Sequence, residues 1–162
     1  MDSVQCLGKK PISLVSEYLF PMARYLDGMP AGSMALDQQT LTSRKILSVH
    51  HQVLTAFDVP GIFHAEYFVT SKGCVVFLEI SWRPAGPPCN VNFEQYAGTN
   101  QSIAYLYLTT DMLSHTDIFF QQPLSIRVFI NHQSGIYDGL SLTLLDDSYR
   151  ILEEIPKGTS CD

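Results

Sequence analysis

The 162-residue sequence predicts an α+β fold, in which an antiparallel β-sheet is flanked by helices. Two β-rich runs, residues 61–70 and 74–81, are joined by a short link that contains a glycine, which is typical of a hairpin. Apolar residues recur with helical spacing between residues 38 and 57. The resulting order of strands, helix, hairpin, helix and strand is the pattern of an α+β fold built on an antiparallel sheet.

The elements before the hairpin can be assigned in order. Residues 3–19 alternate imperfectly and break at residues 8–11, which predicts a strand, a turn and a second strand. Residues 21–32 contain two prolines and two glycines and predict a loop. A helix is then expected over residues 38–57 and ends at Val59-Pro60-Gly61. Its apolar stripe consists of Ile46, His50, Val53, Leu54 and Phe57.

The second half of the chain gives weaker signals. Residues 84–89 predict a proline-rich corner, and Thr99 is the expected N-cap of a helix that runs to about Leu113. Residues 123–130 predict a strand that is closed by a turn near residues 132–135. The tail after Asp146 is polar, and its pattern predicts no element.

Composition excludes several classes of protein. The net charge of −6 and the lack of a large Lys/Arg cluster argue against binding of nucleic acid. The N-terminus has no apolar signal-peptide region, and no apolar run approaches the length of a membrane span. The four cysteines form neither a CxxC pair nor a disulfide framework. We therefore expect a reduced, cytoplasmic protein that does not bind a membrane.

The register of the hairpin decides which of its side chains share a face. A two-residue Lys72-Gly73 turn pairs Glu66 with Glu79, whereas a type I turn with a glycine bulge shifts the pairing and separates them. Because the shifted register leaves neither face wholly apolar, we predict the first one. Its acidic face contains Ile62, His64, Glu66, Phe68, Val75, Phe77, Glu79 and Ser81.

Two like charges directly opposite each other destabilise a hairpin unless a proton, an arginine or a divalent cation compensates them. Mg²⁺ is commonly bound by one or two carboxylates together with substrate phosphates. Glu66 and Glu79 therefore predict a magnesium site, with Arg83 beyond it as an anion contact. The alternative is a solvated Glu79 that pairs with Arg83 on the surface.

The run FHAEYFVTSKGCVVFLEISWRPAG, residues 63–86, resembles the metal- and phosphate-binding hairpin of the ATP-grasp superfamily. That pattern has an acidic residue on one strand, a glycine turn, and a Glu-Ile-Asn-x-Arg-like run that ends near a glycine. The sequence is most similar to the carboxylate–amine ligase branch, and the upstream SEYL, the Tyr-Leu-Asp-Gly loop and the helix before Gly61 add to the resemblance. It implies a C-terminal ATP-grasp subdomain over residues 1–115, with the hairpin at 62–86. Residues 116–162 would form a strand-containing extension.

The resemblance also implies roles for five residues. Glu66 and Glu79 would ligate Mg²⁺, or Mn²⁺ in its place, and Ser81 would be a weaker ligand where many members have an asparagine. Arg83 would be the catalytic contact to the γ-phosphate of ATP or to an acyl-phosphate, and Leu78 would lie at the nucleotide. The implied chemistry is phosphorylation of a small carboxylate by ATP, followed by attack of an amine.

The family's phosphate-covering loop, its lysines and its preceding substrate domain have no counterpart in this sequence. We therefore expect either a fragment of a longer ligase or a short product with half an active site, which would bind nucleotide weakly and turn over nothing alone. The alternative is a non-catalytic interaction module. In both cases the surface left by the missing half predicts aggregation or association, for example as a homodimer.

A zinc-deaminase signature is a weaker interpretation of the same region. His64-Ala65-Glu66 followed by Pro88-Cys89 resembles its HxE and PCxxC motifs, but position 92 is Asn92 rather than a second cysteine. Only one histidine and one cysteine would remain as ligands, whereas catalytic zinc uses three protein ligands. We therefore disfavour zinc.

Overall fold

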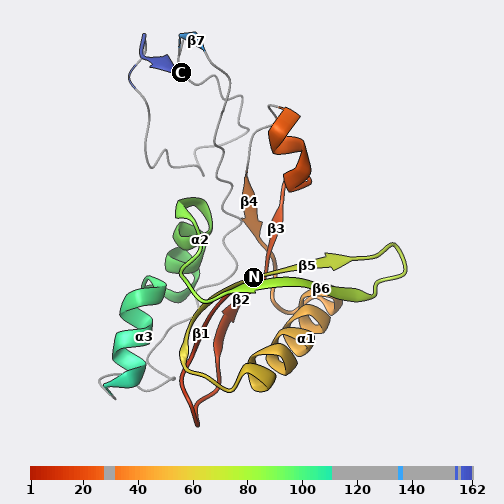
Figure 1. Ribbon diagram of the computed structural model, residues 1–162, viewed down its shortest axis with the longest axis vertical. Coiled ribbons are helices and arrows are strands. Elements are labelled where there is room, and N and C mark those ends of the chain that lie inside the picture. Colours follow the sequence, from red (N-terminus) through yellow and green to blue (C-terminus); the bar gives the residue numbers. More distant parts are fainter. Residues whose placement is uncertain (28–31, 111–134, 137–155, 157, 162) are drawn as a thin grey trace.

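The chain is built around a four-stranded antiparallel sheet with helices on both of its faces (Figure 1). The computed structural model describes residues 1–27, 32–110, 135–136, 156 and 158–161. The α+β class and the antiparallel sheet are confirmed. The predicted strand at 123–130, the turn at 132–134 and most of the polar tail lie outside the described residues.

The sheet has the strand order β2-β1-β5-β6. Its strands are β1 (Asp2–Gln5), β2 (Ile12–Leu14), β5 (Gly61–Val69) and β6 (Val75–Ser81). The turn between the first two contains Gly8, whose positive φ of 73° suits a residue without a Cβ. The β5–β6 hairpin extends beyond the other strands as a projecting ribbon (Figure 1).

Helix α1 (Leu41–Phe57) covers one face of the sheet. Its N-cap Thr40 accepts a hydrogen bond from the backbone N–H of Ser43 at 3.1 Å, and the chain leaves the helix at Asp58 in the left-handed conformation. The predicted stripe is partly right, because Ile46, His50 and Leu54 are buried. Phe57 is exposed, because the helix ends there and its last turn extends past the core.

Two further helices, α2 (Pro87–Ala97) and α3 (Gln101–Thr109), pack on the opposite face. The first was not predicted: a proline-rich corner was expected over residues 84–89, and it is found over 84–86, whereas 87–89 form the first turn of α2. Proline is tolerated in the first turn of a helix, where its missing N–H has no partner to lose. The second begins at N-cap Asn100, one residue after the predicted Thr99, and residues 111–113 of its predicted extent lie outside the described part.

Smaller elements complete the described chain. A second sheet pairs β3 (Ser16–Tyr18) with β4 (Ser33–Ala35), and a short 3₁₀ helix, η1 (Met22–Asp27), lies within the predicted loop. A two-stranded pair is formed by β7 (Gly135–Ile136) and β8 (Ser160–Cys161). Within the ranges described, no helix is long and apolar enough to cross a membrane.

The hairpin confirms the predicted pairing but not the predicted turn. The backbone N–H of Gly73 bonds to the Thr70 carbonyl at 2.8 Å, and Gly73 has a φ of 73°, so the link is a turn with a glycine bulge. Val69 accordingly pairs with Val75, one residue out of the predicted register. A second irregularity then leaves Leu78 without a partner and restores the predicted pairing of Glu66 with Glu79.

These two shifts change the contents of the predicted acidic face. Val75 and Phe77 move to the face covered by α1, where the Tyr67 and Phe77 rings lie 5.7 Å apart between centroids. The face toward α2 and α3 keeps the polar groups of the hairpin. Each face has its own apolar core. The α2/α3 side packs on Val4, Ile12, Leu14, Phe93 and Leu108, and the α1 side packs on Val15, Ile46 and Ala65.

Candidate functional site

The candidate site is the carboxylate pair at the centre of the β5–β6 ladder. Glu66 and Glu79 are direct cross-strand partners, so their Cβ atoms are about 5 Å apart on one face of the sheet. His64 and Ser81 form the next pair on that same face. The face opposite α1 therefore carries two carboxylates, an imidazole and a hydroxyl group within two ladder positions.

The two glutamates differ in how firmly they are held. The Glu66 side chain is 25% exposed, and its Oε1 accepts a hydrogen bond from the Tyr18 hydroxyl group at 2.5 Å. His64 Nε2 lies 3.4 Å from the same oxygen. Glu79 is exposed, and no hydrogen bond or ion pair holds its carboxylate within the described residues. One carboxylate is fixed and the other can reorient.

A buried aspartate lies behind His64. Asp2 is on the neighbouring strand β1, directly opposite His64, and its Oδ1 lies 2.8 Å from His64 Nδ1. The Asp2 side chain is fully buried, and its Oδ2 has no hydrogen-bond partner among the described residues. The arrangement places one imidazole between two carboxylates. Only an imidazolium can donate to both of them, because a neutral ring carries a single N–H.

Burial keeps the phenol and the thiol near this site protonated. Desolvation, followed by the hydrogen bond to Glu66, raises the pKa of Tyr18 far above its ordinary value. Burial and the nearby Asp2 carboxylate also raise the pKa of Cys89, whose Sγ lies 3.6 Å from the Ser33 hydroxyl oxygen. Tyr18 is therefore a permanent hydrogen-bond donor to Glu66, and Cys89 is a buried thiol rather than a reactive thiolate.

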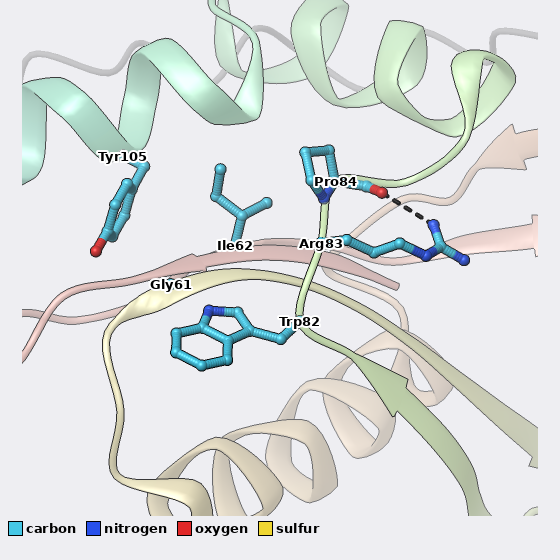
Figure 2. A pocket seen from close by; sticks show the side chains of 6 residues that line it. All are labelled: Gly61, Ile62, Trp82, Arg83, Pro84 and Tyr105. Carbon is cyan, nitrogen blue, oxygen red and sulfur yellow. Dashed lines mark hydrogen bonds between the residues drawn. The ribbon is translucent and has the colours of Figure 1, made fainter.

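The remaining predicted site residues lie at the end of β6 or at its bulge. Ser81 is half-buried on the acidic face. Arg83 is exposed, and its guanidinium donates to the Pro84 carbonyl at 2.9 Å. Figure 2 shows that the Arg83 side chain is directed away from Trp82. Leu78, the unpaired residue of the bulge, is exposed next to Glu79.

A surface pocket of 220 Å³ adjoins this end of the hairpin (Figure 2). Trp82 forms one wall and is 71% exposed, and its ring is nearly parallel to that of Phe63, at an interplanar angle of 13°. The indole lies so close over Gly61 that a Cβ there would come within 2.0 Å of its Nε1. The pocket is lined by Gly61, Ile62, Trp82, Arg83, Pro84 and Tyr105.

Two site residues were missed by sequence reasoning. Tyr18 was noticed only as part of the SEYL run, and Asp2 was not considered. Both reach the site through pairings between distant parts of the chain, with separations of 48 and 62 residues from their partners. The available signal was Asp2 itself, a charged residue at the start of a β-type run, between the apolar Met1 and the small Ser3.

The donor set of the pair suits a hard cation. Two carboxylates and one hydroxyl group are oxygen donors, and a magnesium ion bound with a nucleotide needs no more than two protein carboxylates. Within the described ranges, no group of three or more His, Cys, Asp and Glu side chains is placed to hold a metal ion. No known protein-family model matches the chain, and no curated protein matches its sequence.

Proposed function

We propose that this chain supplies the metal- and nucleotide-binding half of an ATP-dependent carboxylate–amine ligase of the ATP-grasp type. The observation that carries the proposal is the cross-strand pairing of Glu66 with Glu79 on one face of a hairpin. The resemblance of residues 63–86 to the metal-binding hairpin of that superfamily gives the same two residues the same role.

In this proposal each residue has a defined task. Glu66 and Glu79 hold Mg²⁺, or Mn²⁺ in its place, and Ser81 adds a hydroxyl oxygen from the same face. The bound cation would neutralise charge on the phosphates of ATP. Arg83 is exposed, and within the described part of the chain it bonds only to a neighbouring carbonyl, so it can turn toward a phosphate at little cost. Leu78 gives the nucleotide an apolar contact beside the metal.

The acid and amine substrates of such a ligase would be small molecules. The pocket beside Arg83 lies next to the proposed phosphate contact, and it has room for one small acid. Phosphate-covering lysines would come from another part of the complete enzyme. We therefore expect nucleotide binding by this chain to be weak.

The experiment is a titration with MgATP that follows the fluorescence of Trp82, the single tryptophan of the chain. Wild type, Glu66→Gln and Glu79→Gln are compared, with Glu94→Gln as the control because Glu94 is an exposed glutamate on α2. Loss of either ligand should weaken binding by at least about 100-fold, since even outer partners of a metal ligand account for 10- to 100-fold. Glu94→Gln should bind like wild type.

Nucleotide binding that does not depend on Mg²⁺, or that survives both glutamate substitutions, contradicts the proposal. A second candidate is then favoured, a non-catalytic interaction module. Its supporting observation is the row of exposed apolar side chains on the projecting hairpin, which includes Phe68, Val76 and Leu78. Such a module should show no change of Trp82 fluorescence with MgATP.

A further inference from the structure

The hydrogen bonds around Glu66 treat its two carboxylate oxygens differently. Oε1 is 2.5 Å from the Tyr18 hydroxyl group and 3.4 Å from His64 Nε2. No hydrogen bond or ion pair reaches Oε2 from the part of the chain that is described. A carboxylate held through one oxygen loses rotational freedom, while its other oxygen keeps its lone pairs.

The groups that hold Oε1 are themselves fixed. Tyr18 belongs to β3 in the second sheet, so it reaches Glu66 from a different sheet. His64 is 6% exposed and is held from behind by Asp2 at 2.8 Å. Asp2 is fully buried on β1. Four side chains from three strands therefore form one chain of contacts, which ends at a single oxygen of Glu66.

We infer that Tyr18, His64 and Asp2 are positioning residues that preorganise Glu66, so that Oε2 alone is presented to the metal. This inference rests on the proposed function. It assigns unequal tasks to the two glutamates, because Glu66 is the fixed, monodentate ligand and Glu79 is the mobile ligand that closes on the ion. Because Glu66 is already oriented, metal binding costs less side-chain entropy than it would with a freely rotating ligand.

The fold offers a matched control for this inference. Tyr67 lies next to Glu66 on β5 but points to the opposite face, where its hydroxyl group is 2.8 Å from His50 Nδ1. Tyr18→Phe and Tyr67→Phe each remove one hydroxyl group that is bonded within a histidine network. Both substitutions should lower the thermal midpoint, but only Tyr18→Phe alters the hydrogen bonding of Glu66.

The experiment measures Mn²⁺ affinity by electron paramagnetic resonance on the whole chain. Tyr18→Phe and His64→Ala should weaken Mn²⁺ binding by about 10- to 100-fold. Tyr67→Phe should bind like wild type. His64→Gln keeps an amide donor near the position of Nε2 and should recover part of the affinity that His64→Ala loses. Asp2→Asn keeps an acceptor for Nδ1 and should cost less than His64→Ala.

A second measurement requires no metal. Relaxation of the side-chain methylene carbons should show Glu66 more ordered than Glu79 in wild type, and as mobile as Glu79 in Tyr18→Phe. If Glu66→Gln abolishes Mn²⁺ binding while Tyr18→Phe and His64→Ala bind like wild type, the positioning inference is overturned and the proposed function stands. If wild type binds no Mn²⁺, the proposed function fails and takes the inference with it.

Discussion

The two faces of the four-stranded sheet each carry a buried histidine, and the two histidines have very different surroundings. On the α1 side, His50 lies 2.9 Å from Ser3 Oγ through Nε2 and 2.8 Å from the Tyr67 hydroxyl group through Nδ1. On the α2/α3 side, His64 lies between Asp2 and Glu66, with Tyr18 beside it.

The difference separates a structural network from one with unused binding capacity. Both ring nitrogens of His50 have partners, and both partners are neutral hydroxyl groups that can either donate or accept. Around His64 the partners include two carboxylates, Asp2 Oδ2 is unpaired among the described residues, and the exposed Glu79 lies across the ladder from Glu66. A closed, uncharged network contributes to stability alone, whereas an open anionic one can take up a cation.

The largest expected effects concern the apolar packing that supports each face. Phe93 on α2 is fully buried against the sheet, and Leu54 on α1 is 1% exposed. Phe93→Ala should cost about 3–5 kcal/mol and Leu54→Ala about 2–5 kcal/mol of unfolding free energy. Denaturant unfolding followed by circular dichroism measures both. Leu106→Ala, at a side chain that is 54% exposed, is the control and should change little. A loss below about 1 kcal/mol at Phe93 would mean that α2 is not part of the core.

The next effect tests whether the His50 network is neutral. Burial, as the largest cause, lowers the pKa of His50 to about 3, whereas the unfolded chain has a pKa near 6.5. Below pH 6.5 the unfolded state therefore binds a proton that the folded state does not. The unfolding free energy should fall by about 2 kcal/mol between pH 7 and pH 5, and at about 1.4 kcal/mol per pH unit further down toward pH 3.

The control for this pH dependence is His50→Gln, which removes the titrating group. Burial lowers the pKa of the neighbouring His51 as well, so His51 contributes to the wild-type slope in the same direction. The difference between wild type and His50→Gln isolates the part that belongs to His50. Equal slopes in the two proteins would show that His50 is not held neutral, and the contrast between the two faces would disappear.

The predicted pairing of Glu66 with Glu79 is correct because two departures from the predicted hairpin, each a shift of one residue, cancel. The predicted two-residue turn is wrong at Gly73, and the predicted regular ladder is wrong at Leu78. Polarity was the correct guide because a charged side chain must avoid the α1 face, whatever turn precedes it. The bulge itself could not be predicted, because no residue type in the local sequence marks it; it brings Phe77 onto the face of Tyr67, where the two rings are in contact.

Other features were not predicted because a short window of sequence does not determine them. Helix α2 begins with prolines, which carry the same local signal for a corner as for a first turn. The contacts of Asp2 and Tyr18 with the site depend on the β1–β5 pairing and on the approach of β3, and neither has a signature in a short window of sequence. Residues on the hairpin itself could be placed by periodicity, whereas their outer partners could not.

The smallest expected effect concerns the repulsion within the carboxylate pair. In a metal-free buffer with a chelator, Glu79→Gln should raise the unfolding free energy by a few tenths of a kcal/mol, because it removes one of two like charges that face each other. The gain is small since Glu79 is exposed and water screens it. Glu94→Gln, on the exposed side of α2, should give no such gain.

Salt provides the decisive check on that small difference. At 1 M ionic strength the Debye length falls to about 3 Å, so the advantage of Glu79→Gln should vanish if it arises from repulsion between Glu66 and Glu79. Added Mg²⁺ should reverse its sign, because the cation stabilises only the protein that keeps both carboxylates. A Glu79→Gln variant that is less stable than wild type without metal would show that the pair of side chains is favourable as it stands rather than repulsive. The face beside α2 would then be as self-contained as the His50 network.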